Sequence, residues 1–294
     1  MSYTRINQTH IDFFIAQLGI NSILIDSNIQ EYGSDHTENL NYPPEIVLFP
    51  KSTKEVSRIM AYCNDNNIAV TPSGALTGLS GGAIPVFGGV SLSMKKMNKI
   101  ISVDEKNFQA VVEPGVINED FQNTLREKKL FYPPDPASKG TCTLGGNFAL
   151  NAGGPKAVKY GVTSNYVLNL EIVLPDGKHF WTGANTLKNA TGYNLTQLIV
   201  GSEGTLAVIT KAVIRLLPLP LENILMLIPF QDNKDACDAV TCLTQNNISP
   251  SGLEFMELDA VKFVRDQKYA SIPFKIEDNI ASYLLVELDG NDKE

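Results

Sequence analysis

Alternating hydrophobic and polar positions divide this chain into short strands and amphipathic helices. The sequence Ser52-x-x-Glu55 is a capping box, and apolar residues at helical spacing follow it, which predicts a helix over about 53–66. Short apolar runs at 46–49 and 68–71 predict buried strands on either side of that helix. The chain therefore opens as a β-α-β unit, and a glycine-rich loop follows its second strand directly.

The same patterning continues to the end of the chain. Further strands are expected at 90–94, 100–103, 110–113, 168–172, 178–182 and 206–217, with a helix at about 117–128. Pro218-Leu219-Pro220 is the best linker candidate, and beyond it the pattern restarts. Strands at 224–230, 252–257 and 282–288 alternate with helices at 233–246 and 259–267. This order predicts the first part of a split β-α-β unit, which normally needs another helix and strand to close.

Composition narrows the class of protein. The chain has 294 residues, of which 43% are hydrophobic, and a net charge of -8, which argues against nucleic acid or an anionic membrane as the main partner. We find no signal peptide and no apolar run near the ~20 residues of a membrane span. The four cysteines form no C-x-x-C pair, so we interpret them as free thiols and expect a cytoplasmic protein.

Two glycine-rich segments about sixty residues apart carry the candidate chemistry. The first runs over 71–82, and the second begins with the stiff stretch 132–138 and continues to Gly145-Gly146 and Gly153-Gly154. Glycine lets a backbone amide approach a ligand closely, and successive exposed amides form an anion-binding nest. Two such loops indicate a long ligand with a phosphate-bearing middle.

Other motifs in the sequence give weaker support to different kinds of chemistry. The stretch 78–82 matches G-x-S-x-G, but a hydrolase nucleophile elbow needs a helix next, and residues 83–89 cannot begin one. The sequence has no G-x-G-x-x-G and no Walker A motif, and its three histidines lack metal-ligand spacing. Glu203 lies in Gly201-Ser202-Glu203-Gly204, and both an ordinary turn and a functional loop remain open there.

These motifs together resemble the FAD-linked oxidase family with a vanillyl-alcohol-oxidase (PCMH-type) flavin domain. The similarity is strongest to its glycolate oxidase large-subunit, D-lactate dehydrogenase and D-2-hydroxyglutarate dehydrogenase branch. The matching stretches are 74–85, 112–116, 132–138, 145–147, 151–154, 159–163, 174–177, 192–195 and 201–210. The resemblance implies an α+β fold: an N-terminal helical segment at 1–40, a two-subdomain FAD-binding domain at 41–220, and an incomplete ferredoxin-like cap domain at 221–294.

The resemblance also implies a set of cofactor-binding residues and no metal. The loop formed by Ser73, Gly74, Ala75, Leu76, Thr77, Gly78 and Leu79 resembles the family's pyrophosphate cradle. Pro134, Asp135, Ser138, Thr143, Gly145 and Gly146 resemble the wall along the flavin and ribityl chain. Tyr160, Gly161, Glu203, Gly204 and Ile209 resemble contacts around the adenosine and ribityl portions.

Three departures from the family pattern stand out. Leu76 occupies a position where the family normally has glycine, so its β-carbon is expected to crowd the diphosphate or oppose a positive φ. Thr77 lies near the position where covalent-flavin relatives carry histidine, which implies non-covalent FAD. The family's histidine-containing catalytic element in the C-terminal half has no counterpart here, so we assign no catalytic residue and expect a truncated chain.

The activity that the resemblance implies is hydride transfer from a small 2-hydroxy acid to FAD. The electrons would pass to a separate acceptor, a quinone or an electron-transfer protein. The alternative is a non-catalytic FAD-binding subunit, or a truncated remnant, that needs a partner chain.

Overall fold

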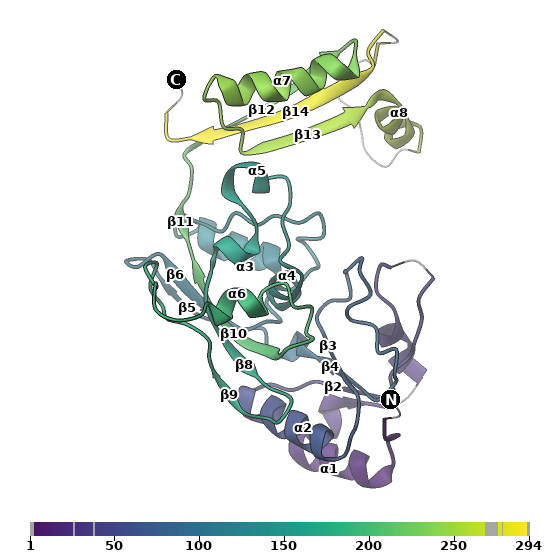
Figure 1. The fold of residues 1–294 in the computed structure, drawn as a ribbon. Coiled ribbons are helices and arrows are strands. Elements are labelled where there is room, and N and C mark those ends of the chain that lie inside the picture. The colour runs from purple at the N-terminus through teal and green to yellow at the C-terminus, as the bar shows by residue number, and fades with distance from the viewer. Residues whose placement is uncertain (1–2, 26, 38, 268–275, 278, 293–294) are drawn as a thin grey trace. The chain divides into compact units, whose positions relative to one another are not determined.

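The structure is a computed structural model that describes residues 3–25, 27–37, 39–267, 276–277 and 279–292. The chain divides into two compact units (Figure 1). The first unit comprises 1–132, 137–152 and 162–218, and the second comprises 133–136, 153–161 and 219–294. Two short segments from the middle of the sequence therefore belong with the C-terminal part of the chain.

The first unit contains a small mixed sheet with the strand order β1-β2-β4-β3. Its elements are α1 (Gln8–Leu18), β1 (Ile23–Leu24), β2 (Ile46–Leu48), α2 (Thr53–Asp65), β3 (Val70–Ser73) and β4 (Val90–Ser93), with single-turn or short 3₁₀ helices at Ile20–Ser22, Ser27–Gly33 and Met94–Lys96. Strands β2 and β3 both run parallel to β4, which lies between them. The predicted β-α-β opening is confirmed, with β4 inserted between its two strands.

Helix α2 illustrates why these residues fold as they do. The Ser52 side chain accepts a hydrogen bond from the Glu55 backbone amide, which satisfies one of the free amides of the first turn. Val56 and Ile59 are completely buried on the inner face, where they join Leu48 and Leu92 in one core cluster. The apolar stripe that was read from the sequence is therefore the face that packs on the sheet.

A second, antiparallel sheet completes the first unit, in the order β5-β6-β10-β8-β9. Its strands are β5 (Ile100–Asp104), β6 (Gln109–Val112), β8 (Val167–Val173), β9 (His179–Trp181) and β10 (Val208–Arg215). The helices α3 (Asn118–Arg126), α4 (Leu144–Leu150) and α6 (Leu195–Ile199), a 3₁₀ turn at Thr163–Asn165 and the short pair β7 (Leu130–Phe131) with β11 (Leu217–Pro218) complete it. Helix α2 contacts β8 and β10, so it lies between the two sheets (Figure 1).

One buried carboxylate ties these two sheets together. Glu171 on β8 accepts hydrogen bonds from Thr53 at the start of α2 (2.7 Å) and from Lys211 on β10 (2.8 Å). Burial alone would raise the pKa of Glu171, but these donors and the Lys211 charge outweigh it, so the pKa lies below its ordinary value. The carboxylate is therefore held in its charged form where α2 meets the second sheet.

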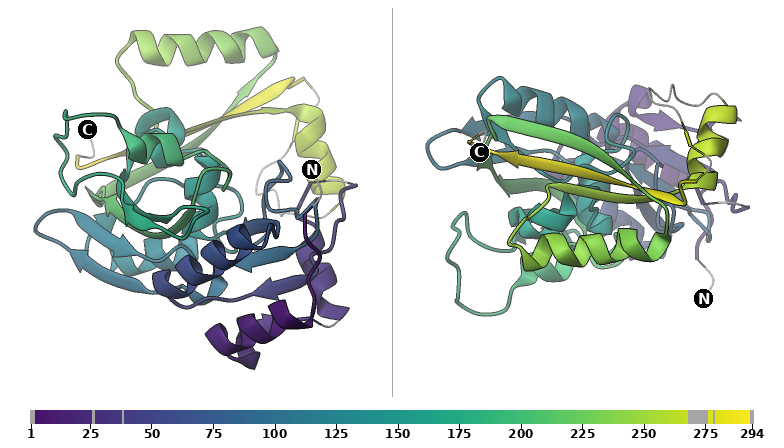
Figure 2. Two further views of the ribbon diagram at one scale, coloured as in Figure 1. Left: turned by 60° about the horizontal axis from the view of Figure 1, so that its bottom comes forward. Right: turned by 90° about the horizontal axis from the view of Figure 1, so that it is seen from above.

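The second unit is a three-stranded antiparallel sheet in the order β12-β14-β13. Its elements are β12 (Glu222–Phe230), α7 (Asn233–Gln245), β13 (Gly252–Glu257), α8 (Leu258–Asp266) and β14 (Ser282–Gly290), together with the short helix α5 (Ala157–Tyr160). Because β14 runs antiparallel to both neighbours, β12 and β13 are parallel with β14 between them, and α7 connects them (Figure 2). These elements are the ones predicted for the first part of a split β-α-β unit.

Candidate flavin-binding site

The first glycine loop, residues 74–82, leaves the end of β3 with its backbone amides free. Every amide from Ala75 to Ala83 lacks a hydrogen-bond acceptor within the described part of the chain. These residues are half-buried or exposed rather than sealed in the core. Consecutive free amides that face accessible space form a site for a phosphate or another anion.

Leu76 has a left-handed backbone conformation within this loop, with φ +62°. That conformation costs an L-residue with a β-carbon roughly 1–2 kcal/mol relative to glycine. The sequence-based expectation was that leucine would crowd the loop or oppose a positive φ. The structure shows the positive φ with leucine in place, so the loop carries backbone strain at this position.

Neighbouring segments hold the first glycine loop in place. The Gly78 carbonyl accepts a hydrogen bond from the His36 amide (2.9 Å), and a β-carbon at Gly78 would lie 3.6 Å from Leu150 at the end of α4. Glu203, at φ +54°, directs its carboxylate toward this loop and accepts a hydrogen bond from the Ser80 hydroxyl at 3.3 Å. The charge in the glycine-flanked turn therefore has a partner, which an ordinary turn would not require.

The turn that carries Glu203 is itself fixed to α4. The amides of Gly201 and Glu203 donate to the carbonyls of Phe148 and Ala149, both at 2.9 Å. Gly204 lies against Pro72, because a β-carbon there would be 3.4 Å from the proline ring. The end of β3, the C-terminal turn of α4 and the 201–204 turn thus meet in one place.

The start of α4 also lies close to the first glycine loop. A β-carbon at Gly74 would lie 2.5 Å from the Thr143 hydroxyl oxygen and 3.7 Å from the Gly146 amide nitrogen, so glycine allows this close approach without displacing the hydroxyl. Gly145 packs equally closely on Pro114, to whose carbonyl its amide donates at 2.7 Å. The structure therefore brings Gly74 close to Thr143 and Gly146, with Ser73 and Gly145 beside them in the chain, and their roles toward FAD stay predictions.

The Thr143 hydroxyl supports the fit of FAD to these loops. Its oxygen is buried and has no hydrogen-bond partner among the described residues. Buried polar groups are almost always satisfied, and a ligand bound between the loops could supply the missing partner after a small rotation of the side chain. The free amides, the glycine contacts and this hydroxyl together suit a polar ligand with a diphosphate.

Ser138 and Ile209, the other predicted cofactor residues discussed for the first unit, lie outside the cluster around the first glycine loop. Ser138 accepts hydrogen bonds at its carbonyl from the amides of Thr141 and Cys142, both at 2.8 Å, in the loop before α4. Ile209 is buried on β10 opposite Ile172 on β8. No contact joins either residue to the glycine loop in the described part of the structure, so their roles toward FAD stay predictions.

Four predicted residues belong to the second unit: Pro134, Asp135, Tyr160 and Gly161. A β-carbon at Gly154 would lie only 2.1 Å from the Asp135 carbonyl oxygen, so the segments 133–136 and 153–161 pack backbone against backbone. The Tyr160 hydroxyl donates to the Asp289 carboxylate at 2.9 Å. The structure therefore gives the Tyr160 hydroxyl a protein partner on β14.

Sequence reasoning missed several residues that shape the site. Pro72, Ser80 and Pro114 contact the predicted glycines or Glu203, yet none was singled out as a site residue. Pro114 lies in a family-like stretch, Val112 to Val116, which was a usable signal. Ser80 drew attention only as a hydrolase nucleophile, and that hypothesis fails because no helix follows it before β4.

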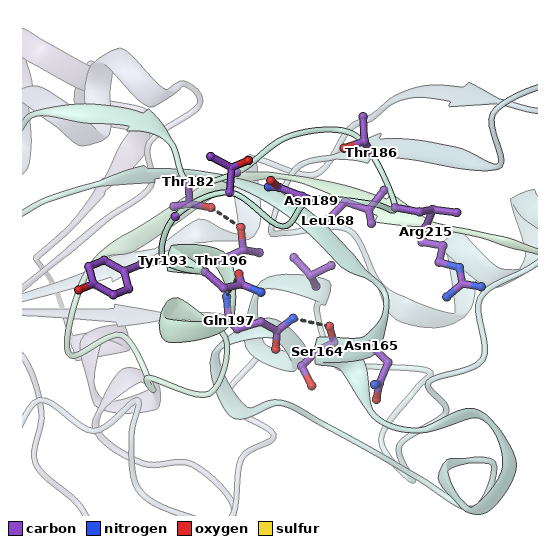
Figure 3. A pocket seen from close by; sticks show the side chains of 16 residues that line it. Ser164, Asn165, Leu168, Thr182, Thr186, Asn189, Tyr193, Thr196, Gln197 and Arg215 are labelled. Atoms are coloured by element: carbon purple, nitrogen blue, oxygen red, sulfur yellow. Dashed lines mark hydrogen bonds between the residues drawn. The ribbon is translucent and has the colours of Figure 1, made fainter.

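A separate polar pocket of about 340 Å³ lies between α6 and the loop that follows β9 (Figure 3). Figure 3 shows the Thr182 and Thr196 hydroxyls in contact and Gln197 bonded to the Ser164 carbonyl, while Arg215 supplies the positive charge of the lining. None of the predicted cofactor residues lines it. This pocket is therefore not part of the glycine-loop site.

Solved structures share this fold. The chain superimposes on an alkyldihydroxyacetonephosphate synthase with a TM-score of 0.83 and 21% identity, covering 99% of this chain and 57% of that one. It superimposes on p-cresol methylhydroxylase with a TM-score of 0.80 and 23% identity, covering 99% of this chain and 63% of that one. These superpositions confirm the predicted α+β fold class.

Sequence comparison identifies the families whose members the chain resembles. Residues 44–183 match the FAD binding domain family, and residues 219–294 match the C-terminal domain of FAD linked oxidases. The chain belongs to the FAD-linked oxidase family, and FAD is its cofactor.

Named relatives come from the branch that the sequence resembled. The chain is 39% identical to D-lactate dehydrogenase of Anaerostipes hadrus, covering 99% of this chain and 62% of the relative. It is 38% identical to glycolate oxidase subunit GlcD of Bacillus subtilis, covering 88% and 54%, and 34% identical to D-2-hydroxyglutarate dehydrogenase of Stutzerimonas stutzeri, covering 92% and 58%. The chain thus spans little more than half the length of these relatives. In the described residues, no helix is long and apolar enough to cross a bilayer.

Proposed function

We propose that this protein is an FAD-dependent oxidoreductase that oxidises a small 2-hydroxy acid. The observation that carries the proposal is the run of free backbone amides from Ala75 to Ala83, beside the buried Thr143 hydroxyl. Support for the substrate class comes from the relatives, whose names specify lactate, glycolate and 2-hydroxyglutarate. FAD, when bound, would supply the redox chemistry, namely acceptance of a hydride from the carbon that bears the hydroxyl, whose proton would leave to a base.

The residues of this chain bind and orient the cofactor in this proposal. The amides of 75–82 would hold the diphosphate, and the Thr143 hydroxyl with the glycines of α4 would line the flavin and ribityl chain. Glu203 orders the loop through Ser80 rather than by touching the phosphates, because a carboxylate would repel them. Pro134, Asp135, Tyr160 and Gly161, which belong to the second unit, are predicted FAD contacts as well.

Domain roles follow the same division. We assign FAD binding to 41–220, with 1–40 as a helical N-terminal segment, and the role of a substrate domain to 221–294. The electrons would leave to a separate quinone or electron-transfer protein. A second candidate is a non-catalytic FAD-binding subunit that works with a partner chain, which the name of the Bacillus relative, a glycolate oxidase subunit, supports.

Acid precipitation of the purified protein tests the cofactor. Bound FAD gives absorption near roughly 370 and 450 nm, and Thr77 in place of a linking histidine predicts that acid releases all the colour into the supernatant. Yellow colour retained in the pellet would show a covalent link. A colourless protein that takes up no added FAD would contradict the proposal.

Anaerobic mixing with D-lactate, glycolate, D-malate and D-2-hydroxyglutarate tests the activity. Bleaching of the 450 nm band by one of these acids is the expected sign of flavin reduction in an active protein. Bound FAD that no acid bleaches would favour the alternative of a subunit that needs a partner chain.

A further inference from the structure

Two partly buried ion pairs connect the segment 153–161, which we call the α5 segment, to strand β14. Lys156 Nζ lies 2.6 Å from Glu287 Oε1, and Lys159 Nζ lies 2.5 Å from Asp289 Oδ1. The side-chain exposures are 16% and 18% for the first pair and 28% and 4% for the second. These pairs are screened less by solvent than exposed ones, so they contribute more to holding the segment.

Each carboxylate also accepts a hydrogen bond from a neutral side chain. Asn223 on β12 donates to Glu287 at 2.6 Å, and the Tyr160 hydroxyl donates to Asp289 at 2.9 Å. Glu287 and Asp289 lie two residues apart on β14 and so project from the same face of the sheet. Charge-assisted hydrogen bonds from several donors fix both the position and the orientation of the α5 segment.

The α5 segment in turn positions residues 133–136. Gly154, at φ +131°, packs so closely on the Asp135 carbonyl that no side chain fits between them. All four predicted FAD contacts of the second unit lie on these two segments, although both fall inside the matched FAD binding domain, 44–183. Their placement therefore depends on carboxylates of the C-terminal domain.

We propose that Glu287 and Asp289 are positioning residues for FAD: through Lys156 and Lys159 they hold the segments 153–161 and 133–136 in the geometry that binds the cofactor. The inference rests on the proposed FAD site and adds to it a dependence of FAD affinity on the C-terminal domain. A loop held in place before binding loses less conformational entropy when the ligand arrives. Without the pairs, part of the binding free energy is spent on ordering the loop.

The test measures FAD affinity by quenching of flavin fluorescence in the full chain. Asp289→Asn and Glu287→Gln keep size and shape but remove the ionic partner, and each should weaken FAD binding about tenfold. The control is Asp176→Asn, which makes the same charge change at an exposed pair with Lys178 in the first unit. Removing a carboxylate by itself favours an anionic ligand, so a loss of affinity cannot come from net charge.

Two further measurements separate positioning from general damage to the fold. Lys156 and Lys159 are trypsin sites, and cleavage after them should accelerate in Asp289→Asn and slow again with FAD, while near-ultraviolet circular dichroism matches wild type. Reversing the first pair, with Lys156→Glu and Glu287→Lys together, should regain most of the affinity that Glu287→Lys alone loses.

The outcomes distinguish the two claims. Wild-type protein that binds no FAD contradicts the proposed function itself. Wild-type protein that binds FAD, with Asp289→Asn and Glu287→Gln indistinguishable from Asp176→Asn, overturns the inference. Failure of the reversed pair to recover affinity, when both single variants are folded, also overturns it.

Discussion

The first glycine loop and the α5 segment are both predicted to hold FAD, yet they are built by different means. Residues 74–82 are positioned by backbone contacts: tight glycine packing and a carbonyl that accepts from His36. The α5 segment is positioned by two lysines that pair with carboxylates on β14. The first design depends on the absence of side chains, and the second depends on charge.

This difference predicts different sensitivities. A backbone-built loop fails when a β-carbon is added and changes little with salt or small shifts of pH. The ion pairs between the α5 segment and β14 weaken as ionic strength rises, because the Debye length falls from about 10 Å at 0.1 M to about 3 Å at 1 M salt. The contact of Gly154 with Asp135 in the same segment is backbone against backbone, and a β-carbon disrupts it as well. Raised ionic strength should therefore perturb the α5 segment and largely spare the first glycine loop, whereas an added β-carbon tests the tightness of a backbone contact in either region.

The largest expected effect comes from adding a methyl group where backbone meets backbone. Gly154→Ala places a β-carbon 2.1 Å from the Asp135 carbonyl oxygen at a positive φ, so the chain must shift. We expect a loss of about 3 kcal/mol in the stability of the second unit. Gly74→Ala meets a hydroxyl that can rotate, and should cost about 1 kcal/mol. Urea unfolding of both variants measures the difference.

The relative losses of stability in Gly154→Ala and Gly74→Ala can contradict this prediction. Equal losses for Gly154→Ala and Gly74→Ala would mean that the contact between 133–136 and the α5 segment is not as rigid as its geometry indicates. A larger loss for Gly74→Ala would reverse the assignment of the tighter backbone contact.

Much of the fold could be predicted because its signals are local. The Ser52 cap, the apolar stripe of α2 and the alternation along β8 depend on neighbours a few residues away, and the elements begin and end within a few residues of the prediction. The membership of the α5 segment in the second unit could not be predicted. Lys156 and Glu287 are 131 positions apart, and no local pattern links them.

The site was predicted in part for the same reason. Glycines at 74, 145 and 146 carry a backbone signal that a single sequence shows, and the structure brings them together. The partner of Glu203 is a serine 123 positions away, and only the tertiary fold reveals it. Residue types that act through the backbone were therefore easier to identify than side chains that act through distant partners.

A pH experiment extends the comparison between backbone-built and charge-built regions to the first unit. The partly buried ion pair Glu171–Lys211 belongs to this unit but is not part of its glycine loop. The pKa of Glu171 lies below its ordinary value of 4.5, since hydrogen bonds and charge from Thr53 and Lys211 outweigh burial. A lowered folded pKa gives stability that is fully present above the unfolded value and is lost as the pH falls through the folded value. Acid should therefore weaken the connection between α2 and the second sheet.

Glu171→Gln tests this expectation. At pH 7 it should destabilise the first unit by about 1.5 kcal/mol, because Lys211 loses its partner. Below pH 4.5 the difference from wild type should shrink, because the unfolded chain binds a proton at Glu171 first and the folded protein follows as the pH falls through its lower pKa. Glu105→Gln, which removes an exposed pair with Lys128, is the matched control and should cost little at any pH. A Glu171→Gln deficit that stays constant down to pH 3 would contradict the charge-based role.

The smallest expected effect concerns Leu76, where the backbone-built loop carries strain. Glycine adopts φ +62° without the penalty that leucine incurs, so Leu76→Gly should bring the apo loop closer to its binding geometry and tighten FAD binding by about 1 kcal/mol, or roughly fivefold. Leu79→Gly is the matched control, because Leu79 is 77% exposed and is not among the residues with positive φ. Its added flexibility should weaken binding slightly.

Calorimetric titration of FAD into the three apo-proteins, wild type, Leu76→Gly and Leu79→Gly, measures both changes in affinity. If Leu76→Gly binds FAD no more tightly than wild type and also unfolds at lower urea, the leucine side chain stabilises the loop by packing, and the strain at its backbone does not limit affinity.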